Sequence, residues 1–207
     1  MTKSLVVNCS LDKKSRIPEL LGAIEEFSEY TVVGFRDISD DFKISRDIDA
    51  IVLSGSLARI VESTERDMFK ETVKLIKQLD LPMFCICFGH QLLCWSLGAE
   101  VASHGTQIQR FEEVRVINDD EIFEGFKKNQ FLTLAEHHND YVVKTSLQKT
   151  ELVLIADSKS CEVEAIKHQN KPFYGVQFHP ERTKINNEMH LEGLGIIKNF
   201  YKRIVKR

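Results

Sequence analysis

The sequence predicts an α/β protein with a central, mainly parallel sheet and a smaller antiparallel extension. Three observations lead to this prediction. In the first half of the chain, short apolar runs alternate with amphipathic stretches, as in parallel sheets covered by helices on both faces. After Gly98, strand-like runs follow one another with few helices between them. The 207 residues are 43% hydrophobic and 29% charged, which is typical of a globular protein with its own core.

The first half of the chain contains four predicted strands and three predicted helices. The strand-like runs are apolar or β-branched and too short for helices. They comprise residues 5–7, 31–35, 50–53 and 82–86. The helical stretches carry apolar residues three or four positions apart, which favours one buried face. They comprise residues 15–30, 64–79 and 89–97.

Individual residues indicate where these helices begin, pack and end. Ser15 is a suitable N-terminal cap for the first helix, and Pro18 fits its first turn. Met68 and Ile76 lie on the predicted apolar face of the second helix. Gly98 ends the third helix, because glycine readily adopts the left-handed conformation found just after a helix.

The second half of the chain contains five predicted strands and one terminal helix. The strands are rich in aromatic and β-branched residues. They comprise residues 111–117, 131–134, 152–156, 163–166 and 173–178. The segment 191–205 has the period of an amphipathic helix with a basic end. No shift in composition marks a boundary, so we expect one domain over residues 1–207.

Composition and charge exclude several classes of function. The formal charge of −3, from 28 basic and 31 acidic residues, does not suggest a nucleic-acid-binding protein. No apolar run approaches the roughly 20 residues that a membrane span requires. The N-terminal apolar run is too short for a secretory signal. Five cysteines in no regular framework indicate reduced thiols, and hence a cytoplasmic protein.

A cysteine occupies the predicted turn between a strand and a helix. The strand at 82–86 leads directly into Cys87, and Gly89 is expected to let the chain turn sharply. This layout presents a side chain at the carboxyl edge of the sheet, where open α/β sheets bind ligands. The helix dipole there favours a thiolate. Two alternatives remain: Cys87 is an inert buried residue, or it joins Cys85 in a metal site.

A histidine and a glutamate follow the last predicted strand. Pro180 keeps His179 extended, and residues two apart in an extended chain face the same side. His179 and Glu181 can therefore project together. A thiolate nucleophile needs a base to move protons, and that base needs a third group to orient it. The alternative is a structural histidine at a strand end.

Two segments together resemble the signatures of class I glutamine amidotransferases. Residues 87–91 read C-F-G-H-Q, and residues 175–181 read G-V-Q-F-H-P-E. The resemblance implies a flavodoxin-like three-layer fold and a Cys-His-Glu triad that needs no metal or organic cofactor. By this resemblance Cys87 is the nucleophile, His179 the general base and acid, and Glu181 its orienting partner. Gln91 matches the residue of the family that contacts glutamine.

The same resemblance assigns an oxyanion hole. Residues 54–56 read S-G-S after the third strand, where the family carries S-G-G-P. The backbone N–H groups of Gly55 or Ser56, with that of Phe88, would hold the oxyanion. This chain lacks the second glycine and the proline of that loop. It also has Cys85 where the family has glycine. The alternative is an ordinary turn after a strand.

A third segment bears on the acceptor of the ammonia. His138 and Asp140 match the S-H-x-D-x-V stretch of the amidotransferase part of GMP synthetases, and we expect them at a partner interface. A metal site is the alternative, although neighbouring histidines point in different directions. After the second signature, the segment 182–192 is longer than the corresponding link in GMP synthetases.

The predicted activity is hydrolysis of the L-glutamine side-chain amide. The chain has no spare length for a synthetase domain and no P-loop or pyrophosphatase motif, so a separate synthetase chain is expected to receive the ammonia. The resemblance favours the ATP-pyrophosphatase subunit of GMP synthetase. Two alternatives stay open. One is a free-standing γ-glutamyl hydrolase with the same triad, and the other is a non-catalytic regulatory subunit with the same fold.

Overall fold

The computed structural model describes residues 2–12 and 17–205, and within them the backbone forms one large sheet and one small one. The large sheet has nine strands in the order β2-β1-β3-β4-β9-β8-β7-β5-β6. Its strands are β1 (Lys3–Asn8), β2 (Glu29–Gly34), β3 (Ala50–Leu53), β4 (Met83–Ile86), β5 (Val101–Val116), β6 (Phe131–Val142), β7 (Leu152–Ser158), β8 (Ala165–His168) and β9 (Phe173–Val176). The small sheet pairs β10 (Lys184–Ile185) with β11 (Glu188–Met189).

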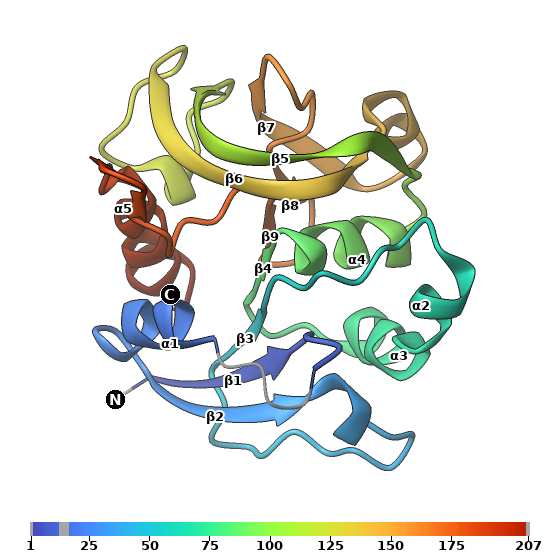
Figure 1. The fold of residues 1–207 in the computed structure, drawn as a ribbon. Helices are drawn as coiled ribbons and strands as arrows, with labels where there is room; N and C mark the ends of the chain where they lie inside the picture. The colour runs from blue at the N-terminus through green and yellow to red at the C-terminus, as the bar shows by residue number, and fades with distance from the viewer. Residues whose placement is uncertain (1, 13–16, 206–207) are drawn as a thin grey trace.

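The large sheet changes character at β9. Strands β2, β1, β3, β4 and β9 are all parallel to their neighbours in this half of the sheet. Beyond β9, the strands β8, β7, β5 and β6 pair antiparallel, and β5 and β6 arch over one end of the molecule (Figure 1). The predicted mainly parallel sheet with an antiparallel extension is therefore confirmed.

Helices cover both faces of the parallel part. They are α1 (Pro18–Glu25), α2 (Ser63–Asp67), α3 (Lys70–Gln78), α4 (Phe88–Ser96) and α5 (Glu192–Asn199). Figure 1 shows α1 and α5 on one side of the sheet and α3 and α4 on the other. Alternate residues of each parallel strand pack into one of two buried clusters, as the two-residue period of a strand requires. In the described chain, no helix combines the length and apolar character needed to cross a membrane.

The first two predicted helices are shorter than their sequence patterns. The helix predicted over 15–30 is reduced to α1 within the described residues 17–30, because Glu29 and Tyr30 pair with β1 as the start of β2. The capping role expected of Ser15 lies outside the described residues.

The helix predicted over 64–79 is broken into α2 and α3 at Phe69. The Phe69 ring is fully buried, with its centroid 4.0 Å from that of Phe35 and 4.6 Å from that of Phe88. Met68, expected on the apolar face, is 41% exposed beside this break.

Two of the antiparallel strands, β5 and β6, are longer than predicted. β5 begins at Val101 rather than Phe111, and β6 continues to Val142 rather than ending at Leu134. Polar residues fill these extensions, so they lack the apolar alternation of a strand. The pairing register shifts between Ser103 and Ile108, as expected for a β-bulge.

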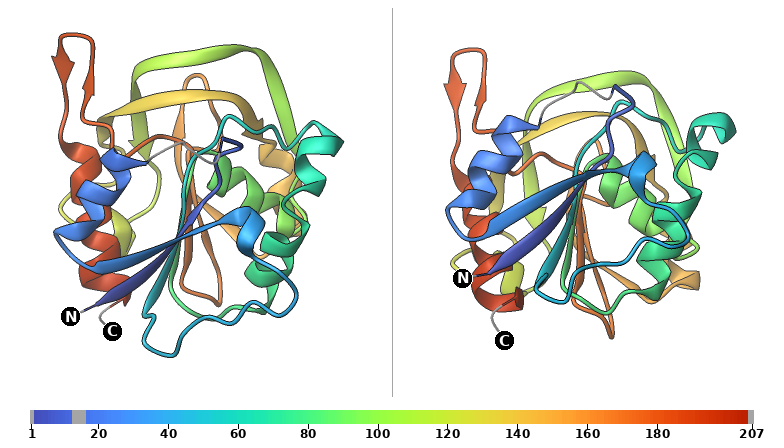
Figure 2. Two further views of the ribbon diagram at one scale, coloured as in Figure 1. Left: turned by 60° about the horizontal axis from the view of Figure 1, so that its bottom comes forward. Right: turned by 90° about the horizontal axis from the view of Figure 1, so that it is seen from below.

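The C-terminal segment departs from a simple helix. The helix expected over 191–205 consists of α5 followed by a π-helical stretch, Phe200–Val205. The extra residues before it form the hairpin of β10 and β11, which projects from the body of the protein (Figure 2). In the part of the chain that the structure describes, three short 3₁₀ helices lie at Phe35–Asp37, Glu121–Phe123 and Lys144–Lys149.

Gly89 at the start of α4 offers a test of this packing. A Cβ atom at Gly89 would lie 2.7 Å from the backbone oxygen of Leu53 on β3, whereas one at Gly22 in α1 would meet nothing within 4 Å. We expect Gly89→Ala to lower the free energy of unfolding by roughly 1–3 kcal/mol because the core is overpacked. Gly22→Ala, the matched control, should raise it by about 0.5–1 kcal/mol through helix propensity. Chemical denaturation of both variants measures this, and equal effects would contradict the close approach.

Candidate active site

Cys87 lies in a strained turn at the carboxyl end of β4. Its φ of 51° and ψ of −107° lie outside the ordinary regions for a residue with a side chain. The turn is held by a 2.8 Å hydrogen bond from the Cys87 N–H to the Val176 carbonyl on β9. Sequence reasoning assigned the sharp turn to Gly89, but the positive φ belongs to Cys87. Such strain is found at functional sites.

The turn places the thiol at the N-terminus of α4. Cys87 is the residue that precedes this helix, and its carbonyl accepts from the Gln91 N–H at 3.0 Å. The first N–H groups of a helix have no partner within the helix, and the dipole is positive there. The position therefore suits a negatively charged sulfur and a developing oxyanion, with the Phe88 N–H among the adjacent donors.

His179 and Glu181 project together beyond the end of β9. The His179 Nδ1 atom lies 2.7 Å from a carboxylate oxygen of Glu181. The His179 N–H donates to the Ala135 carbonyl of β6 at 2.7 Å, which fixes the backbone. Because Nδ1 donates its proton to Glu181, Nε2 is the ring atom left for other chemistry.

The charges around His179 favour its protonated form. Burial by itself lowers the pKa of this imidazole, but the charges of Glu181 and Cys87 outweigh it and hold the pKa well above the usual value. Burial acts to raise the pKa of Glu181, yet the charge and hydrogen bond of His179 leave that pKa lowered. A protonated histidine near a thiol and a carboxylate can deliver a proton to a leaving group.

Gly55 lies directly against both proposed catalytic side chains. A Cβ atom built on Gly55 would be 2.9 Å from Cε1 of His179 and 3.6 Å from Cβ of Cys87. The preceding Ser54 is buried, and its hydroxyl oxygen accepts from the Cys9 N–H at 3.0 Å. Ser56 follows, and its hydroxyl oxygen accepts from the Ala58 N–H at 3.0 Å. The S-G-S loop is therefore fixed beside the thiol.

Two hollows adjoin the cysteine and histidine. A cavity of about 640 Å³ is lined by Gly55, His179 and Glu181, and also by residues of the N-terminal loop and α1. A much smaller hollow of about 20 Å³ contacts Cys87 and Gln91. Gln91 is buried, and its side-chain nitrogen donates to the Asp140 carbonyl at 2.7 Å and to the Gln177 side-chain oxygen at 3.0 Å.

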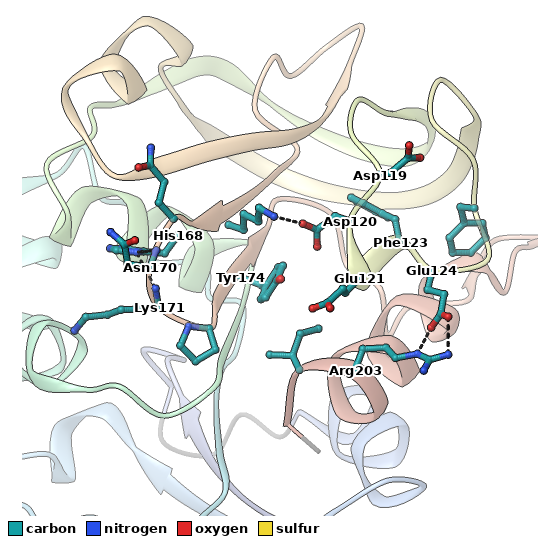
Figure 3. A pocket seen from close by; sticks show the side chains of 15 residues that line it. Asp119, Asp120, Glu121, Phe123, Glu124, His168, Asn170, Lys171, Tyr174 and Arg203 are labelled. Carbon is teal, nitrogen blue, oxygen red and sulfur yellow. Dashed lines mark hydrogen bonds and ion pairs between the residues drawn. The ribbon is translucent and has the colours of Figure 1, made fainter. Parts of the chain in front are cut away.

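Another cavity lies away from these residues. It has a volume of about 840 Å³ and contains no cysteine among the described residues that line it (Figure 3). Its charged side chains are largely engaged with one another: Arg203 pairs with Glu124, and Lys167 pairs with Asp120. The described lining of this cavity brings no cysteine together with a histidine–glutamate pair, so the chemistry is assigned to the cysteine site.

His138 and Asp140 are buried rather than exposed. Their exposed fractions are 4% and 2%, so neither side chain is accessible to a partner in this structure. Asp140 instead forms a 2.9 Å ion pair with Arg59, in the loop that follows Ser56. Sequence reasoning missed Arg59, because it lies 81 residues from Asp140 and belongs to no motif. We propose that this ion pair shapes the small hollow beside Cys87.

The chain is similar to known proteins over most of its length. Residues 13–201 match the family model described as glutamine amidotransferase class-I. The glutamine-hydrolyzing GMP synthase subunit of Methanothermobacter thermautotrophicus is 35% identical over 158 residues, covering 76% of both chains. The GMP synthase of Francisella philomiragia is 31% identical over 200 residues, covering 95% of this chain but 36% of that protein. A Thermoplasma acidophilum crystal structure, described as a GMP synthase subunit, aligns with a TM-score of 0.78 and 27% identity, covering 97% of this chain and 92% of that one.

Proposed function

Because this chain belongs to the class-I glutamine amidotransferase family, we propose that it releases ammonia from glutamine with Cys87 as the nucleophile. His179 acts as the general acid and base, and Glu181 orients it. The observation that carries this proposal is that the Cys87 and His179 side chains both lie against Gly55. His179 Nδ1 in turn lies 2.7 Å from the Glu181 carboxylate.

The reaction follows from the charges in the site. The Cys87 thiolate attacks the amide carbon of glutamine, and the carbonyl oxygen becomes an oxyanion. Protonated His179 donates its Nε2 proton to the amide nitrogen, the C–N bond breaks, and ammonia leaves a thioester on Cys87. Neutral His179 then takes a proton from water, which attacks the thioester. The C–S bond breaks, releasing glutamate and restoring the thiolate and the imidazolium.

Backbone groups and Gln91 complete the proposed site. The N–H groups of Gly55, Ser56 and Phe88 are the proposed oxyanion donors, supported by the fixed loop and the N-terminus of α4 beside the thiol. Gln91 is the proposed contact for the bound glutamine, since it borders the small hollow together with Cys87. The residues described here supply every proton transfer in this scheme.

We propose a separate synthetase as the acceptor of the ammonia. The names of the similar proteins point to GMP synthase, and this chain corresponds to about a third of the longer Francisella philomiragia protein. The proposed partner is therefore the ATP-pyrophosphatase subunit of a GMP synthase. A reducing cytoplasmic setting is proposed as well, because all five cysteines are free and buried.

Labelling with a chloroketone analogue of glutamine tests the site. We expect one adduct, located on Cys87 by peptide mapping, and protection by excess glutamine. Mixing with the ATP-pyrophosphatase subunit of a GMP synthase should then give glutamine-dependent formation of GMP. Labelling of another cysteine would contradict the assignment of the nucleophile. Rapid hydrolysis of γ-glutamyl peptides without any partner would favour a free-standing hydrolase instead.

A further inference from the structure

Two glutamates are completely buried behind the proposed active site. Glu136 on β6 and Glu164 before β8 are each 0% exposed. Their carboxyl groups lie within hydrogen-bonding reach of each other. Neither belongs to the proposed triad. Buried carboxyl groups are costly unless they are neutral or well paired, so this pair requires an explanation.

The neighbouring histidine reveals where a proton must lie. The Nδ1 atom of His138 is 3.0 Å from the Asp140 carbonyl oxygen, which can only accept, so Nδ1 carries a proton. The Nε2 atom lies 3.2 Å from a carboxyl oxygen of Glu136. Within the described chain, no ordinary donor satisfies that nitrogen or either Glu136 oxygen. Two arrangements satisfy this contact: a neutral acid donating to a neutral imidazole, or an imidazolium facing a carboxylate.

Burial decides between these two arrangements. It lowers the pKa of His138 and raises the pKa of Glu136 to about 8, so both shifts favour the uncharged partners. Burial, and then the charge of Glu136, raise the pKa of Glu164 well above its usual value. A Glu164 oxygen also accepts from the Ser158 hydroxyl at 2.7 Å.

The charged and titratable groups that act on this cluster come from several elements. Arg110 and Glu112 lie on β5, Cys161 lies in the segment before β8, and His179 belongs to the proposed triad. The imidazoles of His90, His104 and His137 also interact with His138 through charge. The hydrogen bond with Glu164 and the charges of His179 and Arg110 act to lower the pKa of Glu136, and burial outweighs them.

We propose that Glu136 is a positioning residue that acts as a neutral carboxylic acid, donating its proton to His138 Nε2 and so orienting the wall of the glutamine pocket. Glu164 donates to the other oxygen of Glu136. The chain continues from His138 Nδ1 to the Asp140 carbonyl, which also holds the Gln91 side chain. His138, Asp140 and Gln91 all line the small hollow beside Cys87. This role rests on the proposed function, because it takes that hollow as part of the glutamine pocket.

Two substitutions test whether Glu136 acts as a hydrogen-bond donor or as a charged carboxylate. Glu136→Gln keeps a donor for His138 but cannot ionise, whereas Glu136→Met has a similar size and no donor. At pH 7 we expect the Gln variant to bind the chloroketone glutamine analogue within about twofold of the wild type. The Met variant should bind the analogue on the order of tenfold more weakly, because one buried hydrogen bond is lost. Glu113→Gln, at an exposed position on β5, is the matched control.

The pH dependence gives a second readout that a purely structural role would not move. The Glu136 proton is present below about pH 8 and lost above it, because the pKa of this carboxyl group is raised to about 8, so wild-type affinity for the analogue should fall above that pH. In Glu136→Gln this fall should be absent. If the Gln variant instead binds as weakly as the Met variant, Glu136 is a carboxylate and the inference is wrong.

Infrared spectroscopy tests the proton without catalysis. The wild type should show the carbonyl stretch of a buried protonated carboxyl group at pH 7, and Glu136→Gln should lose part of it. This readout keeps the inference testable if the Met variant does not fold. It also separates two kinds of failure. If Cys87 is never labelled, the proposed function fails, whereas normal labelling without a protonated Glu136 overturns only this inference.

Discussion

Cys87→Ala should abolish glutamine hydrolysis while leaving the protein folded. We expect a loss on the order of 10⁴-fold or more in kcat, because no covalent thioester can form. Alanine also has a Cβ atom, so the strained φ of 51° costs the variant about as much as the native residue. Ammonia release in the presence of the synthetase partner measures the loss, and thermal unfolding monitors the fold.

Cys94→Ala is the matched control for this substitution. Cys94 is a fully buried thiol on α4, the helix that Cys87 precedes, and it contacts His90 rather than the proposed triad. We expect a modest loss of stability, since a small buried side chain is truncated, and unchanged activity. Activity that survives in Cys87→Ala, or disappears equally in both variants, would refute Cys87 as the nucleophile.

The parallel half of the fold could be predicted because its signals are local. Strands β1, β3 and β4 have apolar, buried interiors, as expected for parallel strands covered on both faces, and each is followed by a loop or a helix. Element boundaries were less predictable where tertiary contacts decide them. The break at Phe69 depends on aromatic partners at Phe35 and Phe88, which no local pattern connects to it.

The residues of the candidate site also fall into two groups, those that the sequence predicted and those that only the structure revealed. Cys87, His179 and Glu181 stand in contiguous motifs, and the resemblance of those motifs to a known family implied that the three side chains act together. The contacts that support the site could not be predicted from the sequence. The contact of Glu136 with Glu164, like the ion pair of Arg59 with Asp140, joins residues far apart in the chain. Each member looks like an ordinary charged residue in the sequence.

The buried state of His138 and Asp140 illustrates the limit of reasoning from a motif. Their match to a family motif suggested an interface with a partner, yet alternate residues of β6 point inward, so both side chains face the interior. Strand register, which places them there, is set by the pairing with β5. His138 and Asp140 therefore line the hollow beside Cys87 instead of a surface for a partner.

His179→Ala should be nearly as damaging as loss of the nucleophile. Without a proton donor for the leaving ammonia, we expect a loss on the order of 10³–10⁴-fold in kcat. Alkylation of Cys87 at neutral pH should also slow, because the positive partner of the thiolate is gone. Unchanged rates of alkylation would contradict the pairing of the two residues.

Glu181→Gln tests the same histidine through pH, and here the sign of the effect matters most. In the wild type, the charge of Glu181 helps to hold the pKa of His179 well above its usual value, so the proton donor persists to higher pH. Gln at position 181 still accepts a hydrogen bond but carries no charge, so the alkaline limb of the kcat profile should move to lower pH. Glu188→Gln, exposed on β11, should leave the profile unchanged. An alkaline limb that stays in place would mean that the carboxylate does not govern the pKa of His179.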